Sequence, residues 1–299
     1  MSALEQLSSL RAVIVPVLLV SAIGYAWCRL RLPFDHHFIT DLITNVAAPF
    51  LAFSTFSQVH LDGGKLAVMG LASLACLGFF ALCSVVGLRL ARLPLRVYLP
   101  SLVFPNIGNI GLPVCLFAFG ETGLALAMVY FAICTVLQFT VGRAIAAGRL
   151  QLGEVLRVPF VYAVVLALIV SECGLTIPAW LSNTTAMVGA TAVPLMLLAL
   201  GVALGELRVN HLRRALVLSL ARLLIGLAGG AAIAALLGLE GMERGVVMIQ
   251  SAMPVAVFNY LFARVYGNEP DEVAGMVVVS TTLSYLSLPL VVWLALPRP

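Results

Sequence analysis

The sequence predicts an all-α integral membrane protein in which ten transmembrane helices form two inverted five-helix repeats, with crossing, proline-broken helices 4 and 9. Three observations predict this fold: the apolar composition, the distribution of Lys and Arg between alternate loops, and a weak internal repeat. Hydrophobic residues make up 62% of the chain and charged residues 10%, whereas soluble domains carry about 25% charged residues. We therefore expect the lipid bilayer to surround most of the chain.

Ten apolar segments are each close to the ~20 residues that a transmembrane helix needs. The first segment lacks the basic start and the small-residue cleavage site of a signal peptide, so we interpret it as a span of the mature protein. The fourth and ninth segments are interrupted by proline and asparagine. The ten segments cover residues 9–28, 38–57, 65–88, 97–118, 122–142, 157–174, 180–204, 214–238, 243–263 and 272–296.

Lys and Arg divide unevenly between the two sides of this ten-span arrangement. Twelve of the 17 lie in the loops after spans 1, 3, 5, 7 and 9, namely Arg29, Arg31, Arg89, Arg92, Arg96, Arg143, Arg149, Arg157, Arg208, Arg213, Arg214 and Arg264. The opposite side contains Arg11, Lys65, Arg244 and Arg298, and Arg222 lies inside the eighth span. Because cytoplasmic loops carry the positive excess, we expect both termini to be periplasmic.

The two halves of the chain resemble each other weakly. Three pairs of residues match in order, at offsets of 145, 149 and 147 positions: Pro49 with Pro194, Pro105 with Pro254, and Gly120 with Gly267. Each half has an odd number of spans, so the halves must face opposite ways across the membrane, as in the inverted repeats of many secondary transporters. We expect a first repeat at 1–142, a short cytoplasmic connecting loop at 143–156 and a second repeat at 157–299.

The interruption FPNIGNIGLPV (104–114) places two prolines, two asparagines and two glycines inside an apolar span. Proline removes a backbone donor, and freed backbone groups in lipid each cost several kcal/mol, so such a break persists only inside protein or beside an aqueous cavity. A broken helix exposes a half-helix N-terminus, which binds anions. Asn106 and Asn109 add amide groups, and the break in the other half contains Pro254 and Asn259. These two breaks predict a substrate site.

At these residues the chain resembles the auxin efflux carrier family, which includes the plant PIN carriers and their bacterial relatives. FPNIGNIGLPVCLFAFGETGLALAMVYFA (104–132) resembles the family's most recognisable segment, and TAVPLMLLALGVAL (191–204) is similar to its proline-containing seventh helix. The PIN carriers have a long cytosolic loop between their halves. This chain has a short one, so we expect no regulation through that loop.

The resemblance implies alternating-access transport of small organic anions, such as malonate- or malate-type carboxylates or auxin-like acids. It also implies a scaffold domain of spans 1, 2, 6 and 7, a transport domain of spans 3–5 and 8–10, and a homodimer. Carried over to this chain, the substrate site comprises Asn45, Pro105, Asn106, Gly108, Asn109, Gly111, Pro113, Gln250, Ser251, Pro254 and Asn259.

Three further polar residues are candidates for anion binding or gating. Arg222 would pair with an organic anion, hold the C-terminus of a half-helix, or extend to the cytoplasmic interface. Asp41 would act in coupling or gating, or cap its helix. Gln138 shares a helical face with Thr135 and would serve either the site or the packing of its domain.

Other functions fit the sequence less well. The histidines and acids form none of the patterns of intramembrane enzymes, so we expect no enzyme, cofactor, metal site or nucleic-acid partner. A gated channel with the same repeat is one alternative. Among carriers, the alternative is a Na⁺- or H⁺-coupled symporter or antiporter of the bile-acid or sodium–proton type, although no buried acid pair supports it. The short central loop favours a bacterial inner membrane.

Overall fold

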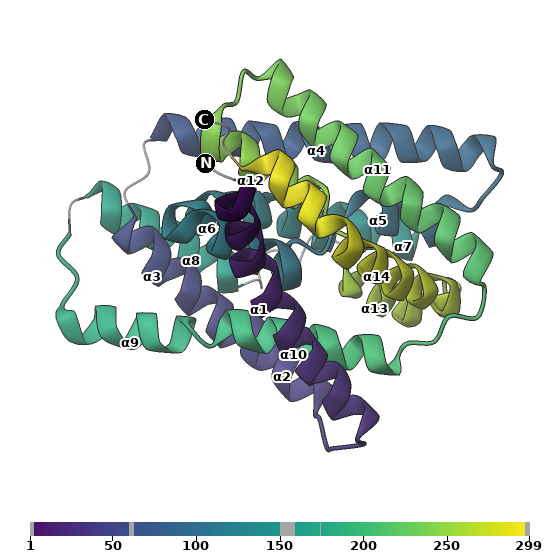
Figure 1. Cartoon of the computed structure of the whole chain (residues 1–299), viewed down its shortest axis with the longest axis horizontal. Coiled ribbons are helices and arrows are strands. Elements are labelled where there is room, and N and C mark those ends of the chain that lie inside the picture. Colours follow the sequence, from purple (N-terminus) through teal and green to yellow (C-terminus); the bar gives the residue numbers. More distant parts are fainter. Residues whose placement is uncertain (1–2, 60–62, 150–158, 174, 297–299) are drawn as a thin grey trace.

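The computed structural model describes residues 3–59, 63–149, 159–173 and 175–296, and these residues form helices joined by short links (Figure 1). Arg157, Arg298 and the second half of the expected connecting loop, residues 150–156, lie outside the described residues. The helices are α1 (Ala3–Arg29), α2 (His36–Leu42), α3 (Ala48–Gln58), α4 (Gly63–Leu90), α5 (Leu95–Val103), α6 (Leu112–Leu137), α7 (Arg143–Ala147), α8 (Pro159–Glu172), α9 (Ala179–Gly189), α10 (Ala192–Glu206), α11 (Leu212–Leu236), α12 (Gly241–Ser251), α13 (Val257–Tyr266) and α14 (Pro270–Ala295), with the π-helical turns η1 (Ile43–Ala47), η2 (Ile107–Gly111) and η3 (Gln138–Gly142).

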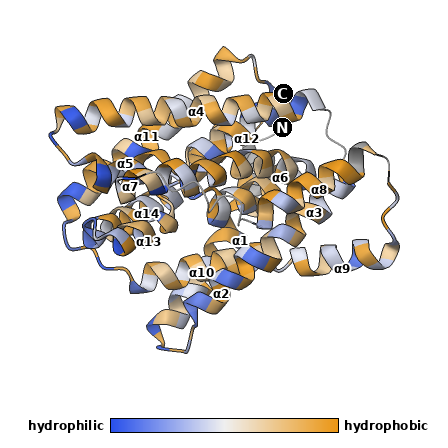
Figure 2. Cartoon of the chain, turned by 180° about the vertical axis from the view of Figure 1, so that it is seen from behind, coloured by the Kyte–Doolittle hydropathy of each residue, from blue (hydrophilic) through white to orange (hydrophobic). Residues whose placement is uncertain are grey.

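The described part of the chain is an all-α integral membrane protein. Seven helical stretches are long and apolar enough to cross a bilayer: Leu10–Arg29, His36–Gln58, Gly63–Leu90, Ile107–Ala147, Ala179–Glu206, Leu212–Leu236 and Pro270–Ala295. Figure 2 shows hydrophobic residues along most of the helical length and hydrophilic residues mainly toward helix ends. Many large apolar side chains face outward, including Leu82, Leu224 and Val265, as expected for a surface that contacts lipid.

Three of the ten expected spans correspond to shorter or broken helices. Segment 97–118 contains α5, η2 and the start of α6; segment 157–174 contains α8; and segment 243–263 contains α12 and α13. The stretch Ile107–Ala147 has 41 residues, which would make a straight helix about 60 Å long, twice the hydrocarbon thickness. It is kinked at Gly120, whose backbone has a φ of 68° and a ψ of −160°.

The helix before the connecting loop is longer than the sequence predicts. We expected the loop to begin at residue 143, but η3 continues directly into α7, which ends at Ala147. Gly148 follows in the left-handed conformation with a φ of 70°, which is a common way for a helix to end. Gly142, directly before the expected start of the loop, keeps a helical φ of −58° and ψ of −48°, so the helix continues to Gly148.

The helices pack in two groups. In one group α1 packs on α10, and α3 packs on α8 and α9. In the other, α4 packs on α5, α6 and α11, while α11 also packs on α12 and α14. Figure 1 shows α4 and α11 along one edge of the molecule and α9 and α10 along the opposite edge, with the broken helices between them.

The contact between α1 and α10 depends on glycines that let the two backbones approach closely. A Cβ atom on Gly201 would lie 2.0 Å from the carbonyl oxygen of Ser21, and one on Gly24 would lie 2.2 Å from that of Leu198. Close packing through small residues is a main source of helix association in lipid, where no hydrophobic effect operates between helices.

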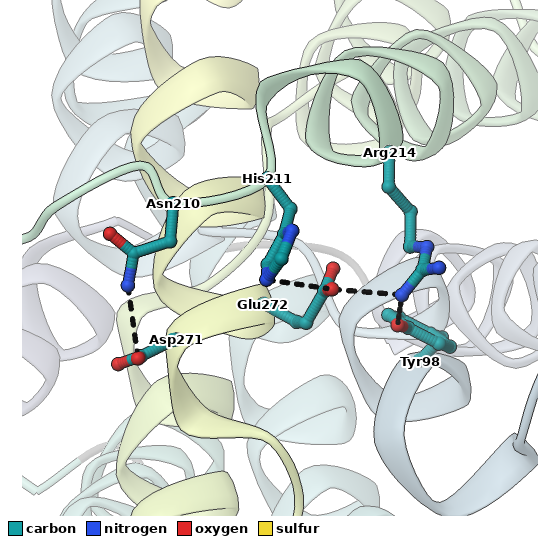
Figure 3. A network of polar contacts seen from close by, with 6 residues as sticks. All are labelled: Tyr98, Asn210, His211, Arg214, Asp271 and Glu272. Atoms are coloured by element: carbon teal, nitrogen blue, oxygen red, sulfur yellow. Dashed lines mark hydrogen bonds and ion pairs between the residues drawn. The ribbon is translucent and has the colours of Figure 1, made fainter.

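A polar network joins α5, α11 and α14 at the end of the molecule where α11 and α14 begin (Figure 3). Arg214 donates hydrogen bonds to the hydroxyl of Tyr98 (3.2 Å) and to the carboxylate of Glu272 (2.8 Å). The ring of His211 lies 3.8 Å from the same carboxylate, and a neighbouring Asn–Asp hydrogen bond of 3.0 Å also ties the link before α11 to α14. Glu272 is buried, so these contacts compensate its removal from water.

Replacing Gly201 with alanine should destabilise the protein, because the new methyl group would overlap the α1 backbone. Overpacking of this kind costs about 1–3 kcal/mol. Gly78→Ala in α4 is the matched control, since nothing lies within 4 Å of its Cβ position, and alanine stabilises a helix interior by roughly 0.5–1 kcal/mol relative to glycine. Thermal unfolding in detergent measures both changes. Equal unfolding temperatures for the two variants would contradict the α1–α10 packing.

Candidate functional site

The two helix breaks lie against each other at the centre of the molecule. α5 ends before Phe104 and α12 ends before Ala252, and each is followed by a short extended stretch. These stretches form an antiparallel bridge between Pro105 and Val255. The flanking hydrogen bonds run from Asn106 N to Pro254 O (2.7 Å) and from Ala256 N to Phe104 O (3.3 Å). Backbone groups that lie outside the helix at one break are thus paired by the stretch at the other break.

Arg222 joins the C-terminal ends of both broken helices. Its side chain is completely buried, and it donates to the carbonyl oxygens of Leu102 (2.9 Å), Ser251 (2.6 Å) and Met253 (3.4 Å). Its guanidinium carbon lies 4.5 Å from the centroid of the Phe80 ring. Of the three roles that the sequence left open, the structure places Arg222 at the half-helix C-termini, where a cation opposes the partial negative charge.

Asn259 and Gln138 are also engaged in holding the breaks. Asn259 Nδ2 donates to the carbonyl of Phe104 (3.0 Å), and Gln138 Nε2 donates to Asn259 Oδ1 (3.1 Å). The backbone N–H of Val255 donates to Ser280 Oγ (3.0 Å). Both amide side chains are buried, so they satisfy the opened backbone and each other.

Asn106 and Asn109 lie at the N-terminus of the half-helix that begins with η2. Asn106 has a φ of −79° and a ψ of 63°, an inverse γ-turn, and its Oδ1 accepts the N–H of Asn109 (3.3 Å). Asn106 is 5% exposed, and its Nδ2 has no hydrogen-bond partner among the described residues. A buried, unpaired amide donor at the positive end of a helix suits an anionic ligand.

Gln250 and Ser251 lie behind the crossing, within the packing of α12 on α6. Gln250 Nε2 donates to the carbonyl of Ala127 (3.3 Å), and Ser251 Oγ lies 3.2 Å from the hydroxyl of Tyr130. A Cβ atom on Gly111 would lie 2.0 Å from Gln250 Oε1. Gln250 and Ser251 therefore hold α12 against α6 next to the crossing, and Gly111 provides the space for Gln250.

Gly108 and Pro113 have packing positions in the structure. A Cβ atom on Gly108 would lie 2.9 Å from the Phe131 ring. Pro113 is buried at the second position of α6, directly after the π-helical turn η2.

A cavity of about 920 Å³ leads from the loop before α2 to the crossing. Asp41 and Thr44 line one wall, together with Glu206 of α10, while Asn109 and the α13 residues Tyr260 and Arg264 line the other. Asn109 is the cavity residue that belongs to the FPNIGNIGLPV stretch. The cavity therefore joins the half-helix N-terminus to one end of the molecule.

Asn45 is the expected site residue that lies in the π-helical turn η1. It is exposed and outside the cavity lining, whereas Asp41 and Thr44 line the cavity. The π-helical turn η1 spans residues 43–47, and its wider turn shifts the side-chain directions that a regular α-helix would give.

Two cavity residues of α13, Tyr260 and Arg264, are absent from the site predicted from the sequence. Val257, Tyr260, Leu261 and Arg264 all line the cavity and follow the i, i+3, i+4, i+7 spacing of one helical face. That periodicity was the signal that could have identified them. Among the described residues, no group of three or more His, Cys, Asp or Glu side chains is placed to hold a metal ion.

Replacing Arg222 with methionine should destabilise the protein strongly. Three carbonyl oxygens would lose their donor, and each buried unsatisfied group costs about 1–3 kcal/mol. Arg222→Lys should recover only part of the stability, because one ammonium lacks the planar fork of the guanidinium. Arg213→Met, at the exposed start of the same helix, is the control. Thermal unfolding in detergent tests this, and wild-type stability of Arg222→Met would contradict the role of Arg222.

Comparison with known proteins agrees with a transport function. A family model described as "Membrane transport protein" matches residues 148–292. An uncharacterized transporter of Methanocaldococcus jannaschii is 24% identical over 302 residues, covering 95% of this chain and 98% of that protein. An uncharacterized transporter of Methanothermobacter thermautotrophicus is 27% identical over 274 residues, covering 86% of this chain and 88% of that protein.

Both similarities extend over most of the chain, including the two breaks, and the family match covers most of its second half. The protein is a membrane transporter and not an enzyme. Its residues 148–292 are similar to the membrane transport protein family, in agreement with the auxin efflux carrier family that its sequence resembles.

Proposed function

We propose that this protein is a secondary transporter that moves small organic anions, such as malonate- or malate-type carboxylates or auxin-like acids, by alternating access at the crossed breaks. One observation carries the proposal: the half-helix that begins at η2 has an unpaired Nδ2 donor on Asn106 at its N-terminus, and Asn109 in its first turn lines the 920 Å³ cavity. Free N–H groups and the helix dipole favour anions at such a position.

The balance of charge at the crossing supports the choice of an anion. Two helices, α5 and α12, end there, and two, η2–α6 and α13, begin there. Helix ends carry roughly −0.5 and +0.5 elementary charge, so the four ends nearly cancel. Arg222 adds one positive charge, and it donates hydrogen bonds to carbonyl oxygens rather than to a carboxylate. The crossing is therefore left with a surplus of about one positive charge.

We also propose the ten-span inverted repeat, with repeats at 1–142 and 157–299 and a connecting loop between them. The two breaks at Pro105 and Pro254 are the main support. Pro49 and Pro194 each lie near the start of a helix that follows an interruption, and Gly120 and Gly267 both have a φ of 68°. These three matched pairs are the ones that the sequence repeat aligns.

The two packing groups support a scaffold domain built on α1, α3, α8 and α10 beside a transport domain that contains the crossing. The cavity lies between α2 and α10 on one side and α13 on the other, where the two domains would move relative to each other. The excess of arginine supports periplasmic termini. A bacterial inner membrane and a homodimer complete the proposal.

A cation-coupled symporter or antiporter is the second candidate, and Asp41 is the observation that favours it. Its exposed carboxylate lines the same cavity as Asn109, and no hydrogen bond or ion pair of its side chain occurs among the described residues. An acid in a transport cavity is a default candidate for ion coupling. In this candidate function Asp41 would bind Na⁺ or H⁺ beside the substrate.

Ligand-induced stabilisation tests the proposed substrate class. Purified protein is heated in detergent with carboxylates (malonate, malate, indole acetate), amino acids, neutral metabolites and NaCl or KCl at matched ionic strength. We expect one or more carboxylates to raise the unfolding temperature. At a ligand concentration 100-fold above Kd, binding adds about 2.7 kcal/mol to the free energy of unfolding. Stabilisation only by cations or neutral compounds would overturn the anion proposal, and a carboxylate effect that needs Na⁺ would favour the cation-coupled candidate.

Alanine variants of the asparagines distinguish residues that bind the substrate from residues that stabilise the fold. Asn109→Ala and Asn106→Ala should each lose the carboxylate effect and reduce uptake and counterflow into liposomes at least tenfold, while unfolding without ligand changes little for the partly exposed Asn109. Asn259→Ala should lower stability instead, because Asn259 holds the Phe104 carbonyl. Asn183→Ala, on the exposed face of α9, is the matched control. Normal uptake in both Asn106→Ala and Asn109→Ala would remove these side chains from the mechanism.

A further inference from the structure

A second cleft lies between α1, α10 and α14, beside the central cavity. α14 contacts α1 where the hydroxyl of Tyr285 donates to Ser21 Oγ (2.8 Å). From this contact the two helices diverge toward the C-terminal end of α1 (Figure 1). They leave a cavity of about 750 Å³, with Tyr25 and Arg29 on the α1 side and Thr282 on the α14 side.

Two arginines give the open end of this cleft a positive charge. Arg29 lies in the last turn of α1, and Arg208 lies in the link between α10 and α11. Both are exposed, and neither has an ion pair or side-chain hydrogen bond among the described residues. The acid of the lining, Glu206, is bonded instead to His36 at 2.8 Å. Two guanidinium groups are therefore available to one ligand.

The cleft lies at the depth of a membrane interface. The apolar spans Leu10–Arg29 and Ala179–Glu206 both end beside it. Tyr25 and Trp27 are 45% and 41% exposed on the last turns of α1, and exposed Tyr and Trp are typical of residues at the level of lipid headgroups. Leu204 and Val278 provide apolar wall, so the ligand that fits has a negative head and an apolar tail.

We propose that this cleft binds an anionic phospholipid, with its phosphate between Arg29 and Arg208 and an acyl chain between α1 and α14. Basic pockets between transmembrane helices bind anionic headgroups in this way. A soluble phosphate compound shares the headgroup chemistry, but it would leave the apolar wall uncovered. α1 and α14 belong to different packing groups. A lipid bound between them contacts both groups and therefore stabilises their present relative position.

Native mass spectrometry of the purified protein in detergent tests this site directly. Phosphatidylglycerol and phosphatidylcholine with the same acyl chains are titrated separately, and phosphatidylglycerol should bind more tightly. The Arg29→Ala/Arg208→Ala variant should bind phosphatidylglycerol about 30-fold more weakly, which corresponds to about 1 kcal/mol for each arginine. Arg89→Ala/Arg213→Ala removes the same charge from exposed positions outside the cleft and is the control.

Two further measurements test whether the acyl chain occupies the cleft and whether the bound phosphate belongs to a lipid or to a soluble compound. Thr282→Phe should weaken phosphatidylglycerol binding while both arginines remain, because the ring would fill the space for the acyl chain. Inorganic phosphate and glycerol phosphate at millimolar concentration should not displace the lipid. Equal binding of the two lipids, equal losses in the two arginine variants, or displacement by the soluble phosphates would each overturn the proposal.

Discussion

The pairing of the two helix breaks is the constraint on which the rest of the structure depends. Pro105 and Pro254 interrupt their helices in the interior of a membrane protein, and the freed backbone groups must be satisfied by protein. The antiparallel bridge satisfies some of these groups, and Arg222 satisfies three carbonyl oxygens from the two helices. Each break is thus stable only because the other lies beside it.

This arrangement also creates the chemistry of the proposed site. Arg222 opposes the negative ends of α5 and α12, so the positive ends of the half-helices that follow are left to act on a ligand. Asn259 and Gln138 are engaged with the backbone and with each other, whereas Asn106 retains an unpaired donor and Asn109 lines the cavity. Two of the four amides therefore hold the crossing, and the other two lie at the proposed substrate site.

The sequence predicts the positions of the breaks because proline and asparagine have strong local effects on a helix. It left the role of Arg222 open, because choosing among its three roles requires the distance to Leu102 and Ser251, residues of two other helices. It did not indicate the π-helical turn η1 that contains Asn45, since η1 widens one turn without a distinctive residue pattern. It did not show that Gly111 makes room for Gln250, a contact between residues 139 positions apart. Local rules thus identify the interruptions, and only tertiary packing assigns the side chains.

Disulfide trapping across the crossing tests the central claim most directly. Pro105 and Val255 form the bridge pair without hydrogen bonds to each other, for which the Cα atoms lie about 4.5 Å apart, within disulfide range. Pro105→Cys and Val255→Cys are combined in a chain whose native cysteines are alanine and whose connecting loop carries a protease site. After oxidation and cleavage, the account predicts that the two halves stay joined without reductant and separate with it. Complete separation without reductant, in a variant whose reduced form unfolds at the temperature of its parent, would contradict the account.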